Sequence, residues 1–65
     1  SNAVKALERA VKLAPDAAEL HLELADTYKA LGDVKKAKEG YAKVIALDPE
    51  GKSGQAAKKA ASGLK

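Results

Sequence analysis

Apolar residues recur at intervals of three and four along most of the chain. The recurrence runs through Val4, Leu7 and Val11, then Leu20, Leu24 and Tyr28, and resumes from Val34 to Leu47. This spacing puts the apolar side chains on one face of an α-helix, and no stretch alternates as a β-strand would. The pattern therefore predicts an all-α chain of about four helices, over residues 3–14, 17–31, 34–47 and 53–64.

Proline, glycine and aspartate separate the predicted helices. Pro15 ends the first helix, because proline has no amide hydrogen and forces the preceding residue out of the α region. Asp16 is expected to cap the second helix, with Glu19 reaching back to it in a capping box. Gly32 follows the second helix, where a left-handed residue is favoured, and Asp33 is expected to cap the third.

The chain also repeats itself at an interval of 34 residues. Leu-x-Pro occurs at Leu13–Pro15 and again 34 residues later at Leu47–Pro49. Several other positions agree at the same offset, pairing Leu7 with Tyr41, Ala10 with Val44, Val11 with Ile45 and Ala3 with Ala37. Internal repetition at this period is typical of stacked helical repeats.

Composition limits the possible classes of protein. The 65 residues include two Tyr and no Phe, Trp, Met or Cys, which allows one small domain with a thin core. Absence of Cys excludes disulfides and favours the cytoplasm, and no apolar run is long enough to span a membrane or to form a signal peptide. Residues 1–3 are interpreted as the remnant of a purification tag, so the chain from Val4 is expected to come from a longer protein.

The alternation of small and large residues from Ala18 to Gly51 resembles one complete tetratricopeptide repeat. The positions that carry the resemblance are Leu24, Ala25, Tyr28, Gly32, Ala37, Tyr41, Val44 and Pro49. The resemblance implies antiparallel helix pairs stacked as a right-handed α-α superhelix, with these residues packing the repeat. It further implies that residues 4–17 are the second helix of a truncated preceding repeat, that 18–51 are the complete repeat and that 52–65 are a C-terminal capping helix.

The last predicted helix departs from the repeat pattern. Lys58 and Lys59 stand where a continuing repeat would have its Leu-Gly/Ala pair. Ala56, Ala60 and Leu64 are expected to form a narrow apolar stripe that covers the end of the stack, while the lysines face solvent. We therefore expect this segment to be the C-terminal end of a longer array.

In the family that the chain resembles, the first helix of each pair lines a concave groove. The resemblance places on this groove Glu19, Leu22, Glu23, Asp26, Lys29 and Ala30, with Asp33 at its rim. Three carboxylates around an exposed leucine suit a basic or mixed peptide, and the alternative is a solvated helix face. Leu22, Glu23 and Asp26 lack the basic and amide groups with which the family clamps a C-terminal carboxylate, so that ligand is disfavoured.

No combination of side chains indicates catalysis, a metal or a cofactor. His21 has Glu19 and Glu23 two residues away on either side, and side chains at that spacing do not share a helix face, so packing between repeats is favoured for His21. Ser53 and Ser62 have no neighbouring base. The net charge of +3 is divided between an acidic middle and a basic end without interleaved aromatics, which disfavours nucleic acid.

The sequence thus favours a non-enzymatic module that binds a protein or peptide. The alternative is a structural unit that self-associates into a homo-oligomer. In that reading, Val4, Leu7 and Val11 of the first helix are expected to be exposed and to pack against another copy of the chain.

Overall fold

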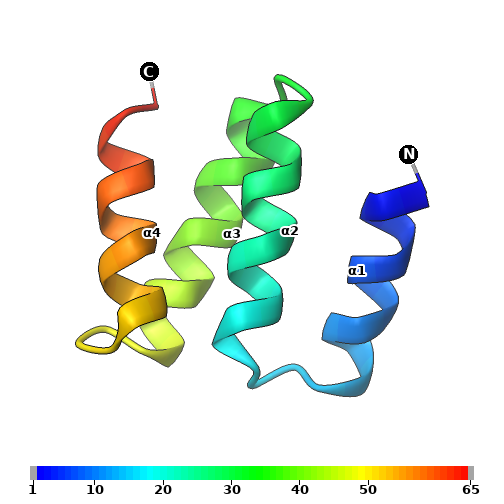
Figure 1. Ribbon diagram of the computed structural model, residues 1–65, viewed down its shortest axis with the longest axis horizontal. Helices are drawn as coiled ribbons and strands as arrows, with labels where there is room; N and C mark the ends of the chain where they lie inside the picture. The colour runs from blue at the N-terminus through cyan, green and yellow to red at the C-terminus, as the bar shows by residue number, and fades with distance from the viewer. Residues whose placement is uncertain (1, 65) are drawn as a thin grey trace.

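The computed structural model describes residues 2–64 and forms four helices in this range (Figure 1). They are α1 (Asn2–Leu13), α2 (Ala18–Ala30), α3 (Val34–Leu47) and α4 (Lys52–Ser62). Successive helices run in opposite directions, with α1 and α4 at the two sides of the molecule. The all-α prediction is confirmed, and every helix end lies within two residues of its predicted place.

The expected tag remnant and capping helix each extend by one residue beyond the described range. Ser1 and Lys65 lie outside the described residues. Asn2 and Ala3, which the sequence assigned to the tag, form the first residues of α1. The first helix therefore begins before Val4 and includes both of these residues.

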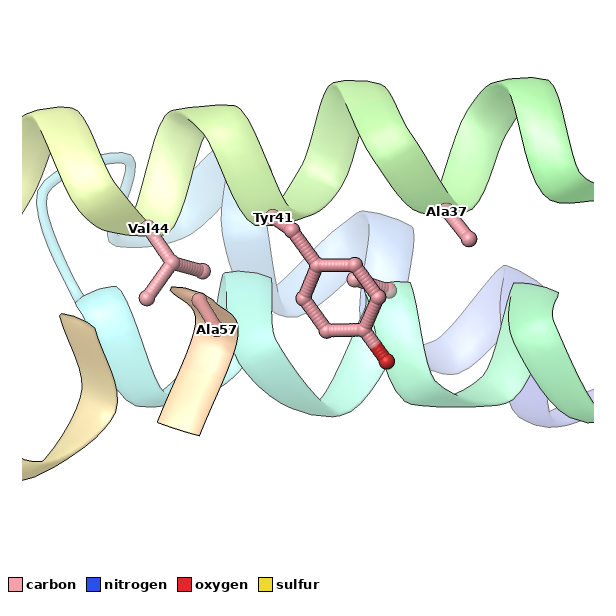
Figure 2. Close-up of a cluster of buried hydrophobic side chains, with 5 residues drawn as sticks. Ala37, Tyr41, Val44 and Ala57 are labelled. Atoms are coloured by element: carbon pink, nitrogen blue, oxygen red, sulfur yellow. The ribbon is translucent and has the colours of Figure 1, made fainter. Parts of the chain in front are cut away.

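The hydrophobic core lies between α2, α3 and α4. Its fully buried residues are Ala25 from α2, Ala37, Tyr41 and Val44 from α3, and Ala57 from α4. Figure 2 shows the Tyr41 ring pointing from α3 toward α2, and Val44 beside Ala57. Alanines let the helix axes approach, and the tyrosine ring fills the remaining space. Among the helices of residues 2–64, α1 contacts only α2 and has no buried residue.

The other residues expected to pack the repeat lie at its edges. Leu24 and Tyr28 are half-buried, and Gly32 and Pro49 are in exposed turns. Gly32 has a φ of 84°, the left-handed conformation that glycine adopts without strain. Its amide donates to the Lys29 carbonyl at 3.1 Å, which together with the next amide closes the end of α2.

Asp33 caps α3 as predicted. Its Oδ1 accepts a hydrogen bond of 3.2 Å from the amide of Lys36, and its own amide donates to the Tyr28 carbonyl at 2.9 Å. One residue therefore terminates α2 through its backbone and starts α3 through its side chain.

The predicted capping box at the start of α2 is wrong. The N-cap residue is Ala17, and no side chain bonds to the first amides of the helix. The Ala17 amide donates to the Ala14 carbonyl at 3.1 Å, closing a turn with Pro15 and Asp16 at its centre. Because the turn delays the helix by one residue, Asp16 precedes the position from which a carboxylate reaches the first turn. His21 holds this turn instead, since its Nε2 donates to the Pro15 carbonyl at 2.8 Å.

The face that α4 turns to the core also differs from the prediction. Gly54 and Ala57 are buried, whereas Ala56, expected in the apolar stripe, is exposed. Ala60 and Leu64 do pack against the core, as expected. The orientation of α4 about its own axis follows from Gly54, because a Cβ at this position would overlap the backbone carbonyl of Asp48. Only a glycine lets the first turn of α4 lie against the end of α3.

Candidate binding surface

An acidic face runs along α2 and is defined here as Glu19, Glu23 and Asp26. All three residues are exposed. Their spacing of four and three residues places them on the same side of the helix. Within residues 2–64, no other side chain engages the carboxylates of Glu19 and Glu23. Lys29 and Ala30, also expected on this surface, are exposed as well.

Leu22 and Asp33 have different surroundings from those the sequence indicated. Leu22 is half-buried and packs against the core, so it is not the exposed leucine expected among the carboxylates. The reason is that α2 contacts both α3 and α4, and Leu22 packs against the buried cluster to which these helices contribute. Asp33 is half-buried, and its carboxylate is engaged in capping α3.

The third member of the acidic face is joined to the core. The hydroxyl of Tyr41 donates a hydrogen bond to Oδ1 of Asp26. Burial of the phenol, and secondly this hydrogen bond to a carboxylate, raise the pKa of Tyr41 well above its usual value near 10. Tyr41 therefore stays protonated and donates, which fixes the position of the Asp26 carboxylate on the surface.

An open acidic hollow of about 380 Å³ lies where α2 and α4 begin and α3 ends. Glu19 and Glu23 line it from α2, Asp48 from the end of α3 and Ser53 from α4. Three carboxylates around one hollow favour a positively charged group such as a lysine or arginine side chain. Sequence analysis missed Asp48 and Ser53, because only the folded turn after α3 brings them beside the first turn of α2.

The other tyrosine, Tyr28, joins three helices on a different side of α2. Its hydroxyl donates to Oε2 of Glu8 in α1 at 2.8 Å, and Nζ of Lys36 in α3 lies 5.6 Å from the centre of its ring. The hydrogen bond to Glu8 is the main cause, and burial the second, of a pKa of Tyr28 above its usual value near 10. The protonated phenol thus connects α1 to the other helices.

The described residues contain no arrangement typical of a metal site or a membrane span. In residues 2–64, no three His, Asp or Glu side chains come together closely enough to hold a metal ion. No helix in that range combines the length and the apolar character needed to cross a bilayer. His21, which the sequence assigned to packing, is buried and bonded to backbone.

Comparison with protein families agrees with the helical architecture. A family model described as tetratricopeptide repeat matches residues 1–61, which is most of the chain. No curated protein and no solved structure matched the chain.

Proposed function

Since the chain belongs to the tetratricopeptide repeat family, which generally mediates protein–protein interaction, we propose that it is a binding module for a basic peptide or protein segment. The proposed binding surface is the acidic face together with the acidic hollow. It involves no catalytic step and no cofactor.

The observation that carries the proposal is the open pair of carboxylates on α2. Glu19 and Glu23 are one helical turn apart, exposed, and unengaged by other side chains of residues 2–64. Both border the hollow that Asp48 completes. A lysine or arginine side chain entering the hollow would meet several carboxylates, and such pairing contributes to both specificity and rate of association.

The experiment is a titration of the chain with fluorescent peptides of eight to ten residues, rich in lysine and arginine, at low and at physiological salt. We expect saturable binding that weakens as salt rises. Replacing Glu19 and Glu23 by lysine should lower the affinity at least about tenfold. Asp26 is left intact, because a substitution there would also remove the partner of the buried Tyr41.

A matched control separates the acidic face from the overall charge. Glu39→Lys makes the same charge change as Glu23→Lys at another exposed helical position, outside the acidic hollow. We expect Glu39→Lys to change affinity less than about twofold. If both single variants weaken binding equally, or if no basic peptide saturates, the acidic face is only a solvated surface and the proposal fails.

Self-association is a second candidate function, and the open side of α1 favours it. The 34-residue period pairs Ala3 and Ala10 with Ala37 and Val44, which are fully buried in α3. In α1, by contrast, Ala3 is exposed and Ala10 is half-buried, and Leu13 is 88% exposed. Val4, Leu7 and Val11, which the sequence expected to be exposed, are half-buried instead. A second copy would therefore meet the side of α1 that carries Leu13.

Sedimentation equilibrium over a wide concentration range tests this second candidate. Self-association through α1 predicts a concentration-dependent dimer that Leu13→Lys returns to monomer. Leu31→Lys is the control, because Leu31 is the other large exposed apolar residue of the described range 2–64 and lies at the end of α2. A monomer at all concentrations would contradict this second candidate function. A dimer that persists in the Leu13→Lys variant would contradict it as well.

A further inference from the structure

A groove with basic walls lies between α1 and α3, on the side of α2 away from the acidic face. It consists of two open hollows of about 500 and 270 Å³ that share Val11 and Leu24. Tyr28 lines the second hollow and is nine residues from Glu19, about two and a half helical turns. The groove and the acidic face are therefore on opposite sides of α2.

The floor of the groove is apolar. Val11 of α1, Leu24 of α2 and the ring of Tyr28 line it, and all three are half-buried. The hydrogen bond from Tyr28 to Glu8 ties the floor to α1. The floor therefore offers apolar contact area beside α1.

The walls of the groove are mainly basic. Lys5, Arg9 and Lys12 line it from α1, and Lys36 and Lys43 line it from α3. All five of these side chains belong to exposed residues. The acidic residues on the walls are Glu8 and Glu39, and Glu8 already accepts the hydrogen bond of Tyr28. Five cations against two carboxylates give the groove a positive charge.

We propose that this groove is a second binding site, for an acidic peptide segment in which apolar residues alternate with Asp or Glu. Its apolar side chains cover Val11 and Leu24, and its carboxylates meet Lys12 of α1 and Lys43 of α3. The segment lies along the groove between the two helices.

Charge and apolar surface together select this ligand. A polyanion without apolar groups would contact the walls alone and leave the floor exposed. A basic segment, the ligand proposed for the acidic face, would be repelled by the walls. The distance from Lys5 to Lys12 along α1 is about 10 Å, which corresponds to about three residues of an extended peptide. An eight-residue probe is therefore long enough.

The test is fluorescence titration of the whole chain with an eight-residue peptide of alternating Glu and Leu, capped at both ends. Two companion peptides carry Ser in place of Leu, or Lys in place of Glu. We expect the Glu-Leu peptide to bind at least about tenfold more tightly than either companion. Chemical shifts of the Val11, Leu24 and Tyr28 amides should change on binding, while those of Glu19 and Glu23 stay in place.

Paired charge reversals locate the site. Lys12→Glu with Lys43→Glu should lower affinity for the Glu-Leu peptide at least about tenfold. Lys38→Glu with Lys58→Glu is the matched control, since it changes the net charge equally at exposed lysines that do not line the groove. Circular dichroism establishes that all variants keep their helix content.

Three results would overturn the proposal. Equal binding of the Glu-Ser peptide would show attraction by charge without the apolar floor. Equal loss in both pairs of variants would show that the groove is not the site. A dimer that only Lys12→Glu with Lys43→Glu dissociates, without peptide binding, would make a second copy of the chain the occupant. Glu19→Lys with Glu23→Lys should leave Glu-Leu peptide binding intact, so this proposal and the proposed function can fail separately.

Discussion

The hydroxyl of Tyr41 donates a hydrogen bond to Asp26, and this contact joins the largest fully buried side chain of residues 2–64 to the exposed acidic face. The ring extends from α3 toward α2 (Figure 2), and the bond crosses between the two helices at the centre of the repeat. Packing of the core and the position of a surface carboxylate are therefore coupled through one residue.

Replacing Tyr41 by phenylalanine should lower the free energy of unfolding by about 1–2 kcal/mol, because a hydrogen bond to a charged group is lost while the ring remains. Urea unfolding followed by circular dichroism measures the change. Tyr28→Phe is the control: its hydroxyl bonds to Glu8 at an exposed position, so we expect a smaller loss. Equal stability of Tyr41→Phe and the parent chain would contradict the role given to this bond.

The raised pKa of Tyr41 predicts a loss of stability at alkaline pH. Below about pH 10 the phenol is protonated in both the folded and the unfolded chain, and its contribution is fully present. Above that pH the unfolded chain releases the proton more readily than the folded chain does, so unfolding becomes more favourable as pH rises.

Urea unfolding between pH 8 and 11.5 checks this dependence, with Tyr41→Phe as the reference. The prediction concerns the difference in unfolding free energy between the parent chain and Tyr41→Phe, because all other ionisable groups are the same in both. The gap in unfolding free energy should shrink as pH rises above about 10, since the parent chain alone loses the Tyr41 contribution. A gap that stays constant across the range would contradict the assignment.

Gly40→Ala should destabilise the fold even though alanine favours helices. A Cβ at Gly40 would lie 2.7 Å from the Cβ of Ala25, closer than packed carbon atoms approach. We expect a loss of about 1–3 kcal/mol from overpacking, against a helix-propensity gain of about 1 kcal/mol. Thermal unfolding measures the balance. Gly63→Ala is the control, because the nearest atom to its added Cβ is 3.5 Å away, and a fall as large as that of Gly40→Ala would count against close helix contact as the cause.

The two aspartates at helix starts should respond differently to alanine. Asp33→Ala removes the side chain that accepts from the Lys36 amide and should cost about 1 kcal/mol. Asp16→Ala should change stability by less than about 0.5 kcal/mol, since Asp16 caps no helix. Chemical denaturation of both variants measures the two losses of unfolding free energy. Equal losses would contradict the finding that Asp16 does not cap α2.

Helix α1 should open before the rest of the molecule, because it has no fully buried residue and contacts α2 alone among the helices of residues 2–64. Hydrogen exchange should be faster in α1 than in α3. Glu8→Ala, which removes the partner of Tyr28, should speed exchange in α1 and leave α3 unchanged, whereas Glu39→Ala should alter neither. Identical exchange rates in α1 and α3 would mean that all four helices unfold as one unit.

Features set by local chemistry were predictable from the sequence. Gly32 and Asp33 mark the turn between α2 and α3 because a left-handed residue and a capping carboxylate act within a few residues of their own position. Helix periodicity located all four helices for the same reason. The period of 34 residues also indicated the family. Among the positions that carried this resemblance, Ala25, Ala37 and Tyr41 are fully buried in the fold.

Features that depend on contacts between segments far apart in the sequence were not predictable. In α4, alanines occur on several sides, so their spacing does not fix its rotation, and Gly54 against the Asp48 carbonyl decides it. Asp48 and Ser53 reach the acidic hollow only after that turn forms. The groove was missed because its lysines belong to α1 and α3, whose separation is a property of the folded arrangement.

Three of the five fully buried hydrophobic residues in residues 2–64 are alanines, Ala25, Ala37 and Ala57, and this gives the chain an uneven tolerance to random change during evolution. Such positions have only a methyl group to lose, but almost any other side chain is larger and would push the helices apart. Drift at these sites is therefore confined to a few small residues. Exposed positions such as Glu19 and Glu23 on the acidic face, and Lys12 and Lys43 in the groove, carry no such restriction, so binding preference can diverge among descendants while the helix spacing stays the same.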